Sequence, residues 1–337
     1  MADVMAEREW AAPFAVDVHR TLAVQGRGRG DPTFRADAAG AIWRTSLTPD
    51  GPATIRVLPG RPLPQAAQED PATLVRAQAW GPGAPWLLEA LPGALGLYDD
   101  ASGFEPDAHP VIKDAARRHP DLRLGRSGRL MEALVPAILE QKVVVLEAHR
   151  AWRILLWKYG TPPPGPAPRG MRVFPDPKTW RRIPSWDWHR AGVEGVRAET
   201  IIRAAGVADS LERLLMLTHE EADRKLQTIP GIGIWTSAEA RQRAAGDPDA
   251  VSVGDYHLKN VVGWALAGKR RSTDEEMLAL LEPFKGHRHR ATRLIGLTRG
   301  NGTASAPKAA GSGVSRYGTG GPPRRGPRNS VRDYRSF

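Results

Sequence analysis

The chain has 337 residues and a mass of 36.7 kDa. At roughly 150 residues per domain, this length predicts about two domains, each large enough to bury a core. The absence of cysteine excludes disulfides, thiol catalysis, thiolate zinc sites and iron–sulfur clusters. No apolar run is long enough to span a bilayer, and the start of the chain lacks a signal peptide. We therefore expect no membrane association and a mature protein that begins where the sequence begins.

The net charge of +11 and the isoelectric point near 10.3 favour a polyanionic partner. After Gly300 the chain holds seven basic residues and one acidic residue, so more than half of the excess charge lies in this segment. The segment is poor in apolar residues, and we expect residues 301–337 to be a basic, mostly disordered tail. Charge alone is equally compatible with a ribosome-associated or membrane-surface protein.

The first third of the chain alternates short β-like runs with turn residues. These runs predict strands at 14–19, 42–47, 54–58 and 75–80. The segment 48–51, Thr-Pro-Asp-Gly, is a hairpin signal because glycine supplies the positive φ that such a turn needs. We therefore expect an antiparallel sheet. A Gly-Arg-Gly-Arg-Gly segment at 26–30 lacks the lysine and hydroxyl of a phosphate loop, so we interpret it as a turn.

From residue 107 onward, apolar residues recur at spacings of three and four, as on one face of a helix. Leu130, Leu134 and Ile138 are one such series. A proline-rich segment at 161–168 interrupts the pattern and predicts a stiff surface loop. The sequence thus predicts an α+β protein in three parts. These are an N-terminal antiparallel β/α domain (1–106), an all-helical domain (107–300) and the tail (301–337).

The segment 226–240 has the pattern of two helices joined by a tight turn. One helix ends near Leu226, and an alanine-rich helix begins near Thr236. The two glycines between them let the backbone approach an anion, and the first amides of the second helix point toward it. Such a helix–hairpin–helix binds phosphate without reading base sequence, although an αα-hairpin without DNA contact uses the same residue types. The hairpin residues are Ile229, Pro230, Gly231, Ile232, Gly233 and Thr236.

An acidic residue, Asp255, follows the hairpin after a strand-like apolar run and Gly254, and it precedes another helical segment. By itself, an aspartate at a helix N-terminus is interpreted as a cap. In combination with the hairpin and this spacing, Asp255 becomes a candidate for a catalytic carboxylate.

With these motifs, the sequence resembles the helix–hairpin–helix superfamily of DNA glycosylases, and within it the bacterial 3-methyladenine DNA glycosylase II family. The resemblance rests on residues 229–236, 253–256 and 132–141, and it extends from about residue 107 to about residue 297. It implies a helical glycosylase domain packed against an N-terminal sheet with helices. It also implies double-stranded DNA as the partner.

The resemblance also implies site residues. The catalytic aspartate of the family corresponds to Asp255, and Trp235 and Tyr256 are the candidates for the pocket that holds a flipped base. Gln141 and Lys142 fall where the family inserts a side chain into the duplex. Members often carry an apolar residue at the position of Lys142, so we expect Lys142 to contact phosphate and Gln141 to share the inserting role. The family implies a structural monovalent cation at the hairpin, no catalytic metal and no other cofactor.

Two absences place the chain within the superfamily. Members that also cleave the strand form a Schiff base through a lysine after the hairpin, and Trp235 stands at that place. The branches with an iron–sulfur cluster need four cysteines, and the chain has none. Both absences favour the monofunctional, alkylation-repair branch.

The expected chemistry follows from the substrate. A purine alkylated at N3 or N7 is cationic and leaves readily once it is flipped out of the stack. A carboxylate at Asp255 would stabilise the cationic sugar and orient water, while aromatic faces would hold the base through cation–π attraction. We therefore predict a monomeric, monofunctional alkylpurine DNA glycosylase of bacterial base excision repair, cytoplasmic and nucleoid-associated. The alternatives are a non-enzymatic DNA-binding protein and a glycosylase for oxidised or deaminated bases.

Other conspicuous residues have structural interpretations. The His-x-His at 287–289 is interleaved with arginines that would repel a metal cation, so we expect a helix start that faces phosphate. Asp247 and Asp249 flank a proline and are predicted to form a turn. Three clustered tryptophans are assigned to the helical core: Trp180, Trp186 and Trp188.

Overall fold

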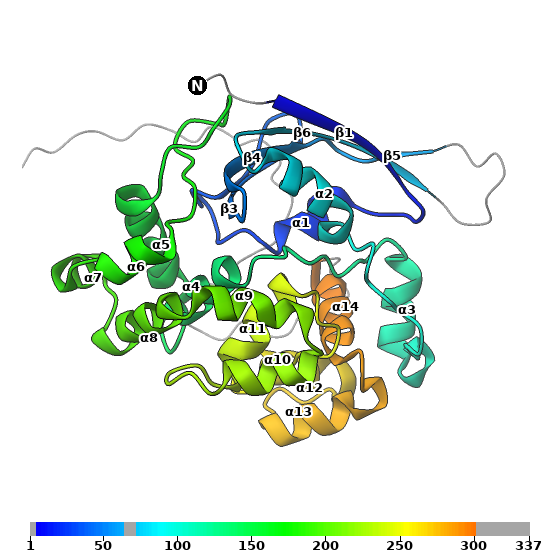
Figure 1. The fold of residues 1–337 in the computed structure, drawn as a ribbon. Helices are drawn as coiled ribbons and strands as arrows, with labels where there is room; N and C mark the ends of the chain where they lie inside the picture. Colours follow the sequence, from blue (N-terminus) through cyan, green and yellow to red (C-terminus); the bar gives the residue numbers. More distant parts are fainter. Residues whose placement is uncertain (1–4, 64–71, 301–337) are drawn as a thin grey trace, which may run out of the picture.

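The computed structural model describes residues 5–63 and 72–300 (Figure 1). Six strands form one antiparallel sheet with the order β1-β6-β4-β3-β2, and β5 pairs with β6. The strands are β1 (Met5–Ala12), β2 (Phe34–Ala36), β3 (Ile42–Thr48), β4 (Gly51–Val57), β5 (Arg61–Pro62) and β6 (Thr73–Trp80). The α+β class predicted from the sequence is confirmed.

Helices make up the rest of the described chain. Two accompany the sheet, namely α1 (Val18–Ala23) and α2 (Ala84–Ala94). The others are α3 (Pro110–Arg118), α4 (Leu130–Leu139), α5 (Val145–Tyr159), α6 (Pro177–Arg182), α7 (Ser185–Ala191), α8 (Gly195–Gly206), α9 (Ala208–Glu212), α10 (His219–Leu226), α11 (Ile234–Ala244), α12 (Leu258–Ala267), α13 (Asp274–Leu281) and α14 (Arg288–Gly300). Short 3-10 turns lie at Pro106–Ala108, Arg213–Met216 and Glu282–Phe284.

The strands predicted at 42–47, 54–58 and 75–80 correspond to β3, β4 and β6, whereas β1 and the short strands β2 and β5 were not predicted. Thr48 pairs with Gly51 across the predicted hairpin, which therefore connects β3 to β4. The strand predicted at 14–19 is wrong, because Asp17 caps α1 by accepting a hydrogen bond from the Arg20 amide at 2.9 Å. Strand β1 is an edge strand with three consecutive charged residues, of which Glu9 pairs with Arg76 of β6.

Three large hydrophobic cores, and a small fourth cluster of Trp43, Trp80 and Met171, hold the described chain together. One lies between the sheet and α2 (Figure 1). The second surrounds α4, nine of whose ten residues are buried. The third joins α3 to α12, α13 and α14. Trp180 and Trp188 belong to the second core as predicted, whereas Trp186 is exposed, which makes the core assignment of Trp186 wrong.

Several sequence expectations concern the ends and boundaries. The tail at 301–337 lies outside the described residues. The domain boundaries at 106/107 and 300/301 stay predictions. Within residues 5–63 and 72–300, no helix is both long and apolar enough to cross a membrane.

Candidate active site and nucleic-acid interface

The hairpin between α10 and α11 is a tight turn with little room. Gly231 has φ +95°, and a Cβ placed on it would lie 2.1 Å from Thr200 Oγ1, so both the conformation and the space require glycine. Gly233 differs, because its backbone is extended and a Cβ there would meet no atom within 4 Å. The hairpin thus packs against α8 at Gly231, whereas the space beside Gly233 is empty.

Helix α11 begins at Ile234, two residues before the predicted start, and Gly233 is its N-cap. No side chain caps it, so the first amides of α11 receive no bond from the N-cap residue. Uncapped amides beside open space, at the positive end of the helix dipole, form an arrangement that accepts an anion.

Asp255 lies in the turn before α12, where three N–H groups orient its carboxylate. Its Oδ1 accepts hydrogen bonds from the His257 and Leu258 amides, each at 2.8 Å. Its Oδ2 faces the indole Nε1 of Trp235 at 3.4 Å. Asp255 therefore accepts the two amides at the start of α12, whose N-cap residue is His257, and it also reaches across to the first turn of α11. The strand-like run before it forms no strand.

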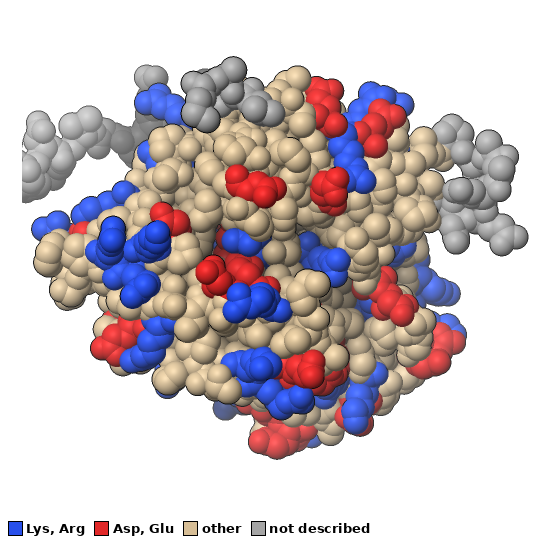
Figure 2. Space-filling view, in the orientation of Figure 1, with Lys and Arg blue, Asp and Glu red and all other residues tan. Residues whose placement is uncertain are grey.

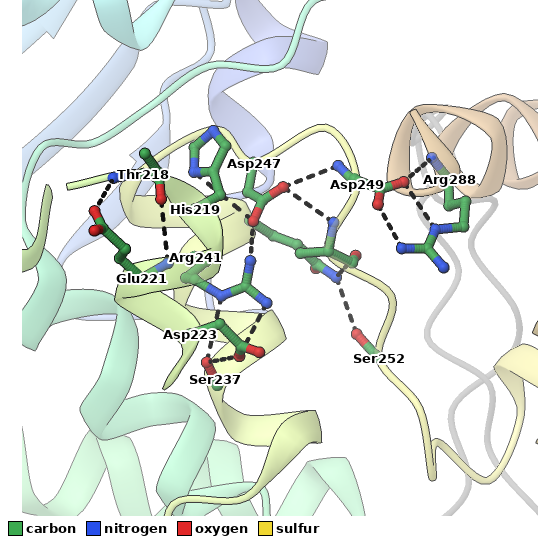
Figure 3. A network of polar contacts seen from close by, with 12 residues as sticks. Thr218, His219, Glu221, Asp223, Ser237, Arg241, Asp247, Asp249, Ser252 and Arg288 are labelled. Atoms are coloured by element: carbon green, nitrogen blue, oxygen red, sulfur yellow. Dashed lines mark hydrogen bonds and ion pairs between the residues drawn. The ribbon is translucent and has the colours of Figure 1, made fainter. Parts of the chain in front are cut away.

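A polar network holds the loop that leads to Asp255 (Figure 3). Arg241 of α11 donates to Asp223 of α10 at 3.1 Å and forms a buried ion pair with Asp247. Asp247 Oδ1 accepts the amides of Asp249 and Ala250, which confirms its predicted turn. The loop is therefore fixed to the hairpin helices at its beginning.

The same loop is fixed further along. Asp249 pairs with Arg288 of α14 at 2.5 Å (Figure 3). Gln242 donates to Ser252 Oγ at 3.0 Å, and Ser252 donates to Glu239 at 2.5 Å. Because Gln242 and Glu239 both lie on α11, this helix holds the loop both where it starts and three residues before Asp255.

The turn between α4 and α5 is attached to the hairpin through Gln141. Its Nε2 donates to the Gly231 carbonyl at 2.9 Å and to Thr236 Oγ1 at 2.8 Å. The next residue, Lys142, is exposed with φ +52°, a conformation that is uncommon outside glycine. Beyond it, Val144 and Leu146 expose their apolar side chains, the latter to 69%. The turn therefore presents one cation and two apolar groups beside the hairpin.

A buried ion pair holds the end of α4, where this turn begins. Arg27, from the Gly-Arg-Gly-Arg-Gly segment, lies 3.4 Å from Glu140 and is buried. Burial alone would raise the pKa of Glu140, but Arg27 and the nearby His149 outweigh it and lower this pKa to about 2. The segment at 26–30 is a turn, as predicted, and one of its two arginines holds the end of α4.

No protein-family model matches the chain. It is 30% identical over 176 residues to a Mycobacterium tuberculosis protein named probable bifunctional transcriptional activator/DNA repair enzyme AlkA, a match that covers 51% of this chain and 33% of that one. It is 25% identical over 189 residues to a DNA-3-methyladenine glycosylase of Bacillus subtilis, covering 55% and 62%. The chain thus spans about a third of the first relative and less than two thirds of the second.

Two solved structures have the same fold. The 3-methyladenine DNA-glycosylase from Archaeoglobus fulgidus aligns with a TM-score of 0.68 at 16% identity, over 86% of this chain and 96% of that one. An 8-oxoguanine glycosylase/lyase of Clostridium acetobutylicum, in complex with double-stranded DNA, gives 0.63 at 13%, over 89% and 98%. The chain resembles helix–hairpin–helix DNA glycosylases in sequence and in fold. The two structures are named for different damaged bases, so the shared fold does not select the substrate.

The structure brings together most of the predicted site residues. Asp255 and Trp235 are in contact, and Gln141 touches Gly231 and Thr236. Tyr256 does not join them, because its side chain is 78% exposed and its ring packs edge-on against His257. The sequence analysis missed Leu146, whose exposure cannot be distinguished from core membership by apolar spacing alone.

Two further expectations change. In the 287–293 segment, Arg288 pairs with Asp249 and the buried Arg290 pairs with Asp99 at 2.5 Å, so the prediction that this helix start faces phosphate is wrong for these two arginines. The structural cation finds a poor fit at two hairpin carbonyls. Pro230 O receives Arg203 at 3.3 Å and Gly231 O receives Gln141, and the Arg203 charge disfavours a second cation there.

Proposed function

We propose that the protein is a monofunctional DNA glycosylase that hydrolyses the N-glycosidic bond of alkylated purines in double-stranded DNA. The observation that carries this proposal is the Asp255 carboxylate, oriented by two α12 amides and facing the Trp235 indole beside an open, uncapped hairpin. The relatives named as 3-methyladenine glycosylases support the alkylated-base class. The protein would act as a monomer in base excision repair.

The chemistry needs one anion at the sugar. Loss of a cationic base leaves positive charge on the ring oxygen and C1′, and a fixed carboxylate stabilises that charge without reorganising. Asp255 keeps Oδ2 directed away from the two amides that hold Oδ1. This oxygen is placed to face the developing cation and to orient the attacking water. Trp235 would then hold the carboxylate in place and offer its ring face to the flipped base.

The monofunctional assignment is supported by where the amines lie. At the position where a strand-cleaving relative would place its lysine, Trp235 supplies an indole that donates to Asp255. Lys259, the second residue of α12, pairs with Asp274 at 3.2 Å. This contact directs the amine toward Asp274 and not toward the Asp255 carboxylate, so water is the proposed nucleophile.

Affinity for the duplex would come from the hairpin and from the turn between α4 and α5. The α11 amides would take a phosphate, and Lys142 would take a second one. Gln141 is already bonded to the hairpin, so Leu146 and Val144 are better candidates than Gln141 to enter the gap left by a flipped base. This differs from the expectation that Gln141 shares the inserting role.

The test is base release from alkylated duplex DNA by the purified protein, with alkali added afterwards to reveal abasic sites. We expect strand breaks only after alkali. Asp255→Asn keeps the shape and the amide contacts but removes the charge, so we expect single-turnover release to fall by about two to three orders of magnitude. Binding to a duplex with an abasic-site analogue should change little.

Three results would redirect the proposal. Tight binding without release from any damaged duplex favours the non-enzymatic alternative. Release from duplexes with oxidised or deaminated bases but not from alkylated ones favours the other glycosylase class. Release that Asp255→Asn leaves intact shows that another residue carries the chemistry. Asp107→Asn, which removes an exposed carboxylate paired with Lys113 outside the proposed site, is the matched control.

A further inference from the structure

One side of the molecule carries arginines without acidic partners. They are Arg29, Arg35, Arg150, Arg153, Arg169 and Arg172, which we call the α5 arginine track. None of the six forms an ion pair with an acidic residue of the described chain. Elsewhere the arginines are commonly neutralised, as in the pairs of Arg241 with Asp247 and Arg290 with Asp99. Unneutralised arginines held side by side repel one another and are stabilised by a polyanion.

Contacts link several members of the track. Arg153 Nη1 donates to the Arg29 carbonyl at 3.4 Å, and Arg35 Nη1 donates to the Arg169 carbonyl at 2.9 Å. Arg172 lies over the ring of Trp157 at 4.7 Å. Contacts with backbone carbonyls and with an aromatic face orient these three guanidinium groups but do not neutralise their charge.

Helix α5 connects the track to the proposed lesion site. Leu146, Arg150, Arg153 and Trp157 follow one another at spacings of four, three and four, so they share one face of α5. Trp157 is 52% exposed on that face. The helix begins at Val145, directly after the turn that Gln141 ties to the hairpin. The track therefore leads away from the hairpin along α5.

Figure 2 shows Lys and Arg side chains gathered at the edge of the molecule formed by α6 and α7, the helices next to α5. Helix α6 carries three exposed basic residues, Lys178, Arg181 and Arg182. The acidic residues on these helices are few. Asp176 caps α6, and Asp187 is buried beneath Lys158. The positive potential of the track is thus extended by its neighbours.

We propose that the α5 arginine track is a second nucleic-acid contact, which binds the phosphates of the duplex on one side of the lesion only. The proposal rests on the proposed function, because it takes the hairpin as the lesion end. The 15 residues of α5 span roughly 22 Å, or about six base pairs of B-DNA. Phosphates at that distance are beyond the reach of the hairpin, so the track would add affinity for flanking duplex.

The experiment measures affinity for three duplexes that carry a central abasic-site analogue. One has a short core, and the others extend this core on the 5′ side or on the 3′ side of the lesion. The parent should gain affinity from only one extension. The variant Arg29→Gln/Arg150→Gln/Arg169→Gln changes exposed track residues and should lose that gain, and its salt slope on the extended duplex should fall by about 2 to 3.

A matched variant controls for net charge. Arg61→Gln/Arg76→Gln/Arg117→Gln removes three exposed arginines from β5, β6 and α3 and should keep both the gain and the slope. Any of three results would overturn the track. The parent gains affinity equally from both extensions, the track variant retains the gain, or the control variant loses as much of the gain as the track variant. Base release is measured separately with the parent. A one-sided gain in affinity without base release refutes the proposed function and leaves the track standing. Base release without a one-sided gain in affinity refutes the track alone.

Discussion

Replacing Gly231 by alanine is expected to destabilise the protein through two separate costs. The residue holds φ at +95°, where a Cβ costs roughly 1 to 2 kcal/mol. The same Cβ would lie 2.1 Å from Thr200 Oγ1, and relieving such overpacking costs typically 1 to 3 kcal/mol more. We therefore expect Gly231→Ala to lower the free energy of unfolding by roughly 2 to 5 kcal/mol.

Denaturant unfolding measures this loss, and two further variants separate its parts. Thr200→Ala in the Gly231→Ala background removes the hydroxyl that clashes, so part of the loss should return as a coupling of about 1 kcal/mol or more. Gly233→Ala places its Cβ in open space with an extended backbone, so stability should change by less than about 0.5 kcal/mol while affinity for duplex DNA falls. If Gly231→Ala unfolds at the same denaturant concentration as the parent, the steric account of this turn is wrong.

Two other predictions concern the supports of the site. Glu140 has its folded pKa lowered from 4.5 to about 2, so its ionised form stabilises the protein by roughly 3 kcal/mol above pH 4.5, and this contribution is lost as pH falls toward 2. Unfolding curves of the parent and Glu140→Gln should therefore converge as the pH is lowered through that window, and a pH-independent gap would contradict this. Asp247→Asn leaves Arg241 with one partner fewer in a buried site, and we expect it to cost roughly 3 to 5 kcal/mol and to slow base release. Asp107→Asn, which breaks an exposed pair with Lys113, should leave both quantities almost unchanged.

The sequence predicted the parts of the site that depend on local chemistry. The hairpin follows from glycines and a helix restart, and Asp255 follows from its place before α12, so both appear where expected. The strand expected at 14–19 failed for an equally local reason, since Asp17 is an N-cap that outweighs the apolar run around it. Strand β1 could not be predicted, because its polar residues are stabilised by pairing with β6 more than sixty residues away.

The remaining differences come from contacts between distant parts of the chain. Arg288 and Arg290 were expected to face phosphate, but their acidic partners lie 39 and 191 residues away in the sequence. Arg27 and Arg29 are neighbours in one glycine-rich turn, yet one is buried against Glu140 and the other lies on the surface beside Arg153. A single sequence carries no signal that distinguishes an arginine in a buried ion pair from an exposed arginine that is accessible to a ligand.

The position of α11 has a consequence for how this chain can vary in length. The helix carries the anion-accepting amides before its first turn, Trp235 within it, and Arg241 near its end. One inserted or deleted residue between them would rotate Trp235 and Arg241 relative to each other by about 100°. The indole would then leave Asp255, or the guanidinium would leave Asp247. Helix α11 therefore has to keep its number of residues.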